Sequence, residues 1–567
     1  MTRKWISKTP PLDEDISSLS REINVNHCLA SILVQRGITS YDQAKYFFRP
    51  SLSHLHDPFL MKDMDKAVAR LQEAVEKKER IMVYGDYDVD GTTSVALVYG
   101  FLHKIYSNIE YYIPDRYTEG YGVSMQGIEY AAKENVKLII SLDCGIKAND
   151  KIAAALNKGI DFIVCDHHRP GEVLPPAIAV LDPKRKDCEY PYKELSGCGV
   201  GYKLLEAYCI REKIDKSELL NYIDLVAVSI ASDIVPITGE NRVLAYYGLK
   251  KLNSSPLPGL KALMELGGLK EEMDITSVVF GIGPRINAAG RIDHAKYAVK
   301  LLLAEQTKEA ETLAIPINKN NTRRKDVDSN ITLEALAMIE GDLLSKDAKS
   351  TVLFKNDWHK GVIGIVASRC IEKYYRPTII LTESNNKATG SARSVIGFDV
   401  YDAISECSDL LEQFGGHMYA AGLTMELDKV TDFKQKFEEV VCRKIKEEHL
   451  IPQLEVDQCI DLNCINFKFY EILKQMAPFG PGNMHPIFIT ENVYAASKPQ
   501  LLKGEHLKLS VKQEGSNFKI DAIGFKMAEY FPMISSGMPF KIAYCIEENN
   551  YRGNRTLQLI LKDIKFE

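Results

Sequence analysis

Short apolar segments alternate with helical patterns through the first half of the chain. The segment Ile81–Tyr84 is followed by an amphipathic stretch from Thr92 to about His103. Four further apolar runs follow it, at Ile109–Ile113, Val136–Leu142, Ile160–Val164 and Ala177–Leu181. Buried parallel strands are short apolar runs joined by crossover helices, so this alternation predicts an α/β fold with a parallel sheet covered on both faces.

A long helical pattern separates this region from a second region of the same kind. The pattern spans about 295–343, and its apolar stripe consists of Val327, Ile331, Ala335 and Met338. A second α/β pattern begins at Thr351–Phe354 and continues to about residue 445. We therefore predict two lobes that are joined by a long helix.

The last part of the chain follows a different period. Leu507, Leu509 and Val511 alternate with polar residues, and similar alternation recurs over 540–546 and 557–561. A period of two residues is typical of half-buried antiparallel strands, so it predicts a small β domain. The 567 residues are too many for one domain. We expect an N-terminal helical segment packing on the core (1–75), a parallel-sheet domain (76–290), linking helices (291–345), a second α/β lobe (346–447) and a β-barrel-like domain (448–567).

Composition and charge limit the possible classes of function. The content of 45% hydrophobic and 26% charged residues is typical of a globular protein with several cores. The net charge of −6 argues against a generally basic nucleic-acid binder, but it permits a metal site, where bound cations reverse the field of clustered carboxylates. No signal-like or membrane-spanning apolar run is visible, so we expect a cytoplasmic protein without membrane contact. The 12 cysteines form no CxxC pair and are expected to be reduced thiols.

Acidic and histidine residues gather in four motifs, three of which follow an apolar strand. The motifs begin at Asp86, Asp143, Asp166 and Asp233 and read DYDVD, DCG, DHH and DIVP. The carboxyl ends of parallel strands meet at one edge of a sheet, where ligands bind. A single aspartate there is more often a helix cap or a turn former. Three aspartates in alternate positions, however, repel one another unless cations compensate.

These residue types suit a pair of divalent cations. Mg²⁺ and Mn²⁺ prefer oxygen ligands, and Mn²⁺ accepts imidazole more readily. Two such ions about 3.5–4 Å apart can share a carboxylate, lower the pKa of a bridging water and neutralise charge on a phosphoryl group. The four motifs together therefore predict a two-metal site that hydrolyses phosphodiesters.

The triplet Asp166-His167-His168 is the name-giving motif of the DHH phosphoesterases, and the surrounding sequence resembles the RecJ family within them. YGDYDVDGTTS (84–94), LDCGI (142–146), the segment 166–185, ASDIVP (231–236) and GIGPRINAAGRID (281–293) are similar to RecJ motifs. WHKGVIGIVASR (358–369), GSARS (390–394) and FGGHMYAAG (414–422) look like a DHHA1 lobe, and APFGPGN (477–483) resembles the start of a RecJ OB-fold region. The resemblance covers nearly the whole chain and implies DHH, DHHA1 and OB-fold-like domains.

The resemblance also implies a ligand set for two Mn²⁺ or Mg²⁺ ions. It maps the ligands to Asp88, Asp90, Asp143, His167 and Asp233, with Asp143 as the bridging carboxylate. Smaller DHH relatives have a histidine where this chain has Tyr84, which is not a normal Mn²⁺ ligand. Asp86 is a candidate to supply the missing contact. His168 is expected to contact the scissile phosphate rather than a metal.

Arginine and glycine motifs suit phosphate, because the guanidinium fork matches phosphate oxygens and glycine admits close backbone approach. By resemblance, Arg116, Ser391 and Arg393 hold a 5′-terminal phosphate. The other residues expected around the scissile phosphate and its neighbours are Arg285, Asn287, Arg291, Gly415, Gly416 and His417. Of these, Arg285 and Asn287 are expected to act in catalysis beside Asp143 and His168.

The resemblance implies a monomeric exonuclease that releases 5′-mononucleotides from single-stranded DNA, in DNA repair and recombination. A single-strand-binding protein or a helicase is a plausible partner by the same resemblance. One alternative is a DHH phosphodiesterase acting on short oligonucleotides or cyclic dinucleotides, and a pyrophosphatase of related core would be much shorter. Another is an inactive DHH replication scaffold, although such proteins lose ligands that are present here. Residues 451–567 hold 13 basic and 13 acidic residues, so charge gives the OB-fold prediction little support.

Overall fold

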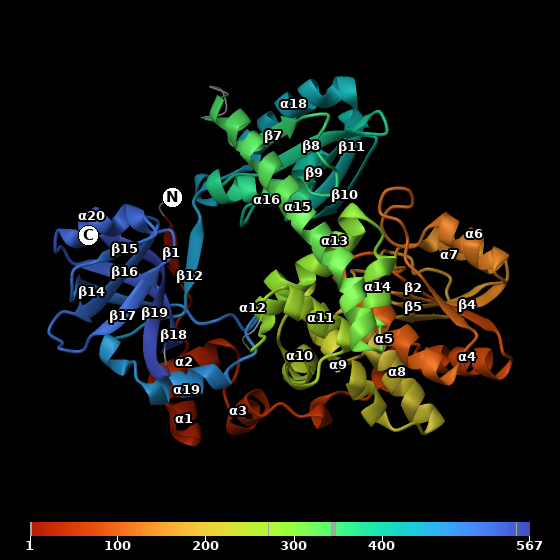
Figure 1. Cartoon of the computed structure of the whole chain (residues 1–567), viewed down its shortest axis with the longest axis horizontal. Coiled ribbons are helices and arrows are strands. Elements are labelled where there is room, and N and C mark those ends of the chain that lie inside the picture. Colours follow the sequence, from red (N-terminus) through yellow and green to blue (C-terminus); the bar gives the residue numbers. More distant parts are fainter. Residues whose placement is uncertain (1–2, 270–271, 342–346, 552, 567) are drawn as a thin grey trace.

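A computed structural model describes residues 3–269, 272–341, 347–551 and 553–566, and the chain forms three lobes (Figure 1). The first lobe is built on a five-stranded parallel sheet of order β3-β2-β4-β5-β6. Its elements in chain order are α4 (Met64–Glu76), β2 (Arg80–Gly85), α5 (Val89–Ile105), β3 (Ile109–Tyr112), α6 (Met125–Lys133), β4 (Val136–Leu142), α7 (Asn149–Asn157), β5 (Asp161–Cys165) and β6 (Ala179–Leu181).

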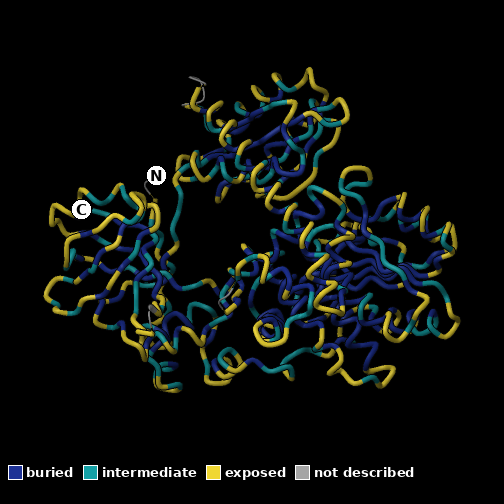
Figure 2. Tube along the Cα trace, viewed as in Figure 1, coloured by how far each residue is buried: buried dark blue, intermediate teal, exposed yellow. Residues whose placement is uncertain are grey.

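The sheet is buried on both faces, as the apolar runs predict. Ile81, Val83 and Ile140 pack in one core with α5, whereas Met82 and Ile139 pack in a second core with α6 and α7. Figure 2 shows the strands of this lobe as buried. The expected α/β fold with a parallel sheet covered on both faces is therefore confirmed.

A helical layer completes the first lobe and carries the chain towards the second. Its elements are α8 (Gly197–Glu212), η3 (Lys216–Tyr222), α9 (Ile223–Ser232), α10 (Gly239–Ser254), α11 (Pro258–Leu266), α12 (Ile275–Ser277), the π-helical turn η4 (Val278–Ile282), α13 (Gly283–Ile292) and α14 (Lys296–Leu302). The long helix α15 (Thr307–Gly341) then runs from α13 and α14 to the second lobe (Figure 1).

The predicted apolar stripe of α15 is correct except at its end. Ile331 and Ala335 are buried against the second lobe, as expected. The prediction is wrong for Met338, which is 39% exposed, whereas Ile339 is buried instead. A spacing of four residues from Ala335 keeps Ile339 on the face that contacts Trp358 and Val362.

The second lobe is a mixed five-stranded sheet of order β10-β11-β9-β8-β7 with helices against it. Its elements are β7 (Thr351–Phe354), α16 (Ile363–Lys373), β8 (Thr378–Ser384), β9 (Lys387–Arg393), α17 (Val400–Ser405), η6 (Ser408–Leu410), β10 (Gln413–His417), β11 (Ala420–Glu426), η7 (Leu427–Lys429) and α18 (Val430–Lys444). The turn η8 (Glu447–Leu450) leads out of it.

The third lobe is a β domain whose seven-stranded sheet closes into a ring through a pairing of β14 with β16. Its elements are β12 (Gln453–Val456), β13 (Gln458–Cys459), η9 (Leu462–Cys464), α19 (Phe467–Gln475), β14 (Phe488–Ala495), β15 (Gln500–Leu502), β16 (His506–Gln513), β17 (Ile520–Gly524), η10 (Ala528–Tyr530), α20 (Phe531–Ser535), β18 (Phe540–Tyr551) and β19 (Asn554–Phe566). The closure is consistent with the expected β-barrel-like domain.

The N-terminal segment packs differently from expectation. It contains β1 (Lys4–Ser7), α1 (Asp13–Ile23), α2 (His27–Gln35), α3 (Tyr41–Phe48), η1 (Leu52–His54) and η2 (Pro58–Leu60). The prediction of one helical segment packing on the core is wrong for its first part, because Leu19, Leu29 and Leu33 join the apolar core of the β domain. β1 also pairs in parallel with β12, which gives its backbone groups partners. Among the described residues, no helix is both long and apolar enough to cross a membrane.

The packing of α2 on the β domain gives a stability prediction. Leu33→Ala removes a side chain that is fully buried in the shared core, so we expect it to destabilise the β domain by about 2–5 kcal/mol. Leu12→Ala is the control, because Leu12 is 72% exposed and its loss should cost less than about 0.5 kcal/mol. Differential scanning calorimetry would show the difference. Equal melting curves for the two variants would contradict the observed packing.

Candidate metal centre

Three neighbouring strands bring the acidic motifs together at one edge of the parallel sheet. β4 pairs with β2 on one side and with β5 on the other. The residues that follow these strands therefore converge, namely Asp86 and Asp88 after β2, Asp143 after β4 and His167 after β5. Asp233 reaches the same place from the end of α9.

His167 lies at the centre of the cluster. Its Nε2 atom is 3.2 Å from Asp143 Oδ1, 3.4 Å from Asp233 Oδ2 and 3.7 Å from Asp90 Oδ2. Both ring nitrogens of His167 and Asp143 Oδ1 are buried without a hydrogen-bond partner among the described residues. Buried polar atoms normally have partners. The donor atoms of Asp90, His167 and Asp233 lie within 4.8 Å of one another, so these residues fit a divalent cation, and Asp143 and His168 lie equally close to His167.

Asp90 is held by groups that the sequence motifs do not include. Its carboxylate accepts hydrogen bonds from the backbone N–H of Gly197 (2.6 Å), the N–H of Cys198 (2.8 Å) and the hydroxyl of Ser229 (2.7 Å). The first two belong to the N-terminus of α8, where a negative charge is stabilised. A Cβ atom at position 197 would lie 2.7 Å from the Cβ atom of Asp143, so this close approach requires glycine.

The backbone of Asp143 is left-handed, with φ of 58°, and its N–H donates to the Cys165 carbonyl over 2.9 Å. Aspartate adopts this conformation more readily than most residues. The turn directs the carboxylate to the ring of His167 instead of along the strand direction. Asp143 therefore faces the cluster around His167, and its bridging role stays a prediction.

Besides Asp90, the first motif contributes two carboxylates whose roles differ. Asp88 caps α5 by accepting from the N–H of Gly91. Asp86 is fully buried, and its Oδ2 atom has no hydrogen-bond partner among the described residues, which leaves it free for a ligand. The hydroxyl of Tyr84 instead donates to the carbonyl of Gly122 over 3.0 Å. Tyr84 thus has a structural role, and the assignment of Asp86 as its replacement stays a prediction.

Burial and mutual repulsion raise the pKa values of three carboxylates in the cluster region. Burial first, and then the charges of Asp90 and Asp88, raise the pKa of Asp233 to about 8. The same two causes raise the pKa of Asp143 well above its usual range, and burial with the charge of Asp88 raises the pKa of Asp86. Ionised carboxylates at this density need a compensating positive charge.

Asp166 orients the second histidine of the triplet instead of facing the cluster. It accepts from the backbone N–H of His167 (2.8 Å) and lies 2.8 Å from His168 Nδ1. Although burial opposes it, this bond and the charge of Asp166 raise the pKa of His168 to about 9. His168 is therefore cationic near neutral pH, and its Nε2 atom lies 3.3 Å from the hydroxyl of Tyr121. A cation there suits the expected phosphate contact.

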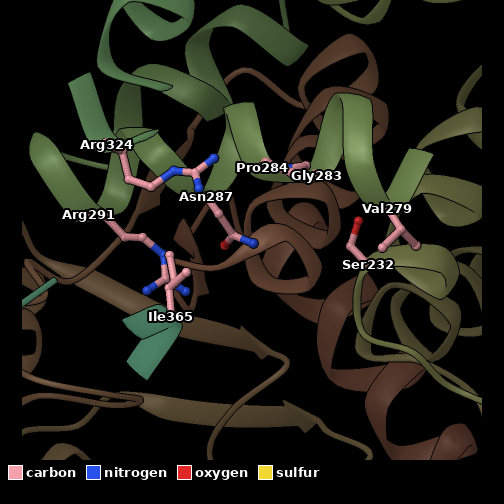
Figure 3. Close-up of a pocket in the computed structure, with 8 residues that line it drawn as sticks. All are labelled: Ser232, Val279, Gly283, Pro284, Asn287, Arg291, Arg324 and Ile365. Atoms are coloured by element: carbon pink, nitrogen blue, oxygen red, sulfur yellow. The ribbon is translucent and has the colours of Figure 1, made fainter. Parts of the chain in front are cut away.

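A cavity of about 180 Å³ lies beside the end of α9, between the first lobe, α15 and the second lobe. Its lining consists of Ser232, Val279, Gly283, Pro284, Asn287, Arg291, Arg324 and Ile365. Figure 3 shows the polar ends of Asn287, Arg291 and Arg324 directed into one side of it. Arg324, from α15, was not among the residues expected from the sequence.

Four guanidinium groups surround this region. Burial first, and then the charges of Arg116, Arg324 and Arg393, lower the pKa of Arg291 to about 10. Arg393 donates to Ser391 Oγ over 3.0 Å, so the two side chains lie together, and their contact with a 5′-phosphate stays a prediction. The guanidinium of Arg116 stacks 4.0 Å from the ring of Tyr87 and donates to the Gly290 carbonyl. Cations from several elements gather here, which suits an anionic ligand, although the charge of Arg324 is already paired with Asp328 over 2.8 Å.

Other expected residues lie apart from the cavity lining. Arg285 donates to the Gly281 carbonyl (2.5 Å) and to the side chain of Asn318 (3.0 Å), which connects α13 to α15. Gly415, Gly416 and His417 are exposed on the edge strand β10. Their predicted contacts with substrate stay predictions.

Comparisons with known proteins agree with this architecture. Family models match residues 80–230 (DHH family, N-terminal domain), 347–442 (DHHA1 domain) and 456–563 (RecJ OB domain). The single-stranded-DNA-specific exonuclease RecJ of Bacillus subtilis is 37% identical over 99% of this chain and 70% of its own length. The chain belongs to the RecJ family.

Solved RecJ structures have the same fold. RecJ of Thermus thermophilus in complex with Mn²⁺ superposes with a TM-score of 0.85 at 28% identity, covering 100% of this chain and 80% of that one. The Mg²⁺ complex of the same protein gives a TM-score of 0.79 at 26% identity, covering 100% and 78%. The order of DHH, DHHA1 and OB domains in the RecJ family therefore applies to the whole chain.

The raised pKa values predict how the metal-free protein responds to pH. A carboxyl whose pKa rises from 3.8 to about 8 on folding binds more protons in the folded state, so its contribution to stability is lost as pH rises between these values. We expect chelator-treated protein to lose melting temperature from about pH 4 to about pH 8, and added Mn²⁺ to restore more stability at pH 8 than at pH 5. Asp143→Asn, which removes one charge, should flatten the loss. A pH-independent melting temperature would contradict the buried repulsion.

Proposed function

We infer that the chain hydrolyses phosphodiester bonds in single-stranded DNA with two divalent cations, Mn²⁺ or Mg²⁺. The observation that carries this inference is the cluster around the buried His167, whose Nε2 atom lies 3.2–3.7 Å from carboxylate oxygens of Asp90, Asp143 and the half-buried Asp233. Family membership supports the substrate, because the relatives are single-stranded-DNA-specific exonucleases. The metal-bound RecJ structures support the choice of ions.

Different side chains have different roles in the reaction. When bound, the cations lower the pKa of water and neutralise the negative charge of the phosphoryl group. Asp90 is pre-oriented by the N-terminus of α8, so it needs no reorganisation to hold a ligand. His168, cationic and fixed by Asp166, donates a proton or a hydrogen bond to a phosphate oxygen. Asn287 and Arg291 orient the neighbouring phosphate from the cavity wall.

The direction of digestion is the second part of the proposal. Arg393, Ser391 and Arg116 hold the phosphate at the 5′ end, and release of 5′-mononucleotides follows from the position of this pocket beside the metal centre. The support is the bond between Arg393 and Ser391 and the convergence of Arg116 and Arg393 on Arg291. We also propose a monomeric cytoplasmic enzyme that works beside a single-strand-binding protein or helicase, as its family membership suggests.

The alternative functions have less support. An inactive scaffold would have no reason to keep buried carboxylates that repel one another, because they destabilise the metal-free fold. A phosphodiesterase for dinucleotides does not account for the β domain, which matches the RecJ OB domain over 456–563. The assay below separates all three functions.

Removing the central carboxylate tests the chemistry. We expect Asp143→Ala to lower turnover on single-stranded DNA by at least about a thousandfold. Cations that are poorly held stabilise the negative charge of the transition state by several kcal/mol less. Full-length protein with Mn²⁺ would be incubated with 5′- or 3′-labelled single strands, duplex DNA, dinucleotides and pyrophosphate. Stepwise loss from the 5′ end of single strands is the expected wild-type result. Cleavage confined to dinucleotides, or no turnover by metal-loaded wild type, would contradict the proposal.

Removing the terminal arginine tests the direction. Arg393→Ala should raise KM about 10- to 100-fold for strands with a 5′-phosphate and change KM little for strands with a 5′-hydroxyl, since charged hydrogen bonds contribute about 1.5–3 kcal/mol. Arg443→Ala is the matched control, because Arg443 lies in an exposed ion pair with Glu406 on the same lobe. An equal rise in KM for both substrates would contradict the role of Arg393 in binding the 5′-phosphate.

A further inference from the structure

The loop that opens the β domain also contacts the first lobe. Residues 477–483, here named the interdomain clasp, lie between α19 and β14. Asn483 holds the loop in shape by donating to the carbonyls of Met476 (2.9 Å) and Pro478 (2.8 Å). Asn483 is itself almost fully buried. The clasp is therefore a fixed structural unit and not a loose linker.

Arg242 of α10 attaches the clasp to the first lobe. Arg242 is only 5% exposed, and its guanidinium donates to the carbonyls of Met476 (3.0 Å), Ala477 (2.9 Å) and Pro478 (3.3 Å). It also donates to the Phe47 carbonyl at the end of α3 over 2.9 Å. One buried side chain thus joins three parts of the molecule through backbone carbonyls.

The other side of the clasp contacts the segment that follows α9. The Pro481 carbonyl accepts a 2.7 Å hydrogen bond from the N–H of Ile237. A Cβ atom at Gly480 would lie 2.5 Å from Ile237 Cγ1, and one at Gly482 would lie 3.0 Å from Thr238 Cγ2. The clasp and this segment therefore fit together without room for a methyl group at position 480.

The clasped segment begins at the candidate ligand Asp233. The next residue, Ile234, has a φ of 60°, which is unfavourable for a β-branched side chain, and it is 64% exposed. Such a conformation persists only where the surroundings fix the backbone. α9 fixes the segment on one side, and the clasp fixes it at Ile237, four residues after Asp233.

We propose that the interdomain clasp positions Asp233, so that the β domain supports the metal centre of the first lobe through Gly480 and Arg242. Both are positioning residues, since neither is among the candidate ligands or the lining of the cavity. The proposal rests on the proposed function, because it needs Asp233 to hold a divalent cation. In this proposal the β domain has a structural role at the metal centre in addition to any contact with DNA.

Gly480→Ala tests the proposal in the full-length protein. The added methyl group must displace Ile237, so we expect Mn²⁺ binding to weaken roughly tenfold, as for other residues that orient a ligand. Free Mn²⁺ is measured by electron paramagnetic resonance, which needs no turnover. Gly341→Ala is the matched control, because no atom of the described residues beyond its own helix turn lies within 4 Å of the added methyl group. Ile237→Ala removes the clashing atoms, so adding Gly480→Ala to it should cause no further loss.

A second variant and a wild-type control distinguish failure of the clasp proposal from failure of the proposed function. If Gly480→Ala does not fold, Arg242→Lys replaces it, since lysine keeps the charge but cannot reach the same carbonyls. If a folded Gly480→Ala or Arg242→Lys variant binds Mn²⁺ as tightly as Gly341→Ala does, the positioning role of the clasp is contradicted. The proposed function is not affected by that result. A wild-type protein that binds no Mn²⁺ would overturn the proposed function as well.

Discussion

The repulsion among buried carboxylates at the edge of the parallel sheet is the constraint on which the site depends. Asp86, Asp143 and Asp233 are each driven towards protonation by burial and by neighbouring negative charge. The fold tolerates this arrangement through fixed donors, such as the α8 amides on Asp90. A pair of bound cations neutralises the remaining repulsion among the carboxylates. The repulsion that destabilises the metal-free fold is therefore the same interaction that favours metal binding.

The sequence predicted those parts of the fold that depend on local patterns. The run Val136–Leu142 coincides with β4, and the other apolar runs match β2, β3, β5 and β6 to within about two residues. Asp143 and His167 could be assigned to one site because parallel strands end at a common edge. The resemblance to the RecJ family added the order of the domains.

The remaining features depend on contacts between distant segments, which local patterns do not contain. The amides of Gly197 and Cys198 lie more than 100 residues from the Asp90 that they bind. The glycine-rich start of α8, SGCGVG, was the available signal for them. Arg324 reaches the cavity only because α15 passes beside α13. The stripe of α15 was predicted wrongly at Met338, because helical spacing from Ala335 allows either Met338 or Ile339 and the surface around Trp358 selects Ile339.

The pairing of β1 with β12 and the packing of α1 and α2 on the β domain affect the order in which the molecule is completed. A ribosome releases the first 48 residues long before their apolar partners around Phe488 and Leu559 exist. During synthesis this segment stays without its apolar partners until the strands β14 to β19 emerge, whereas the first lobe emerges earlier and can already fold. The strands of the β domain therefore complete the packing of the N-terminal segment as well as their own core.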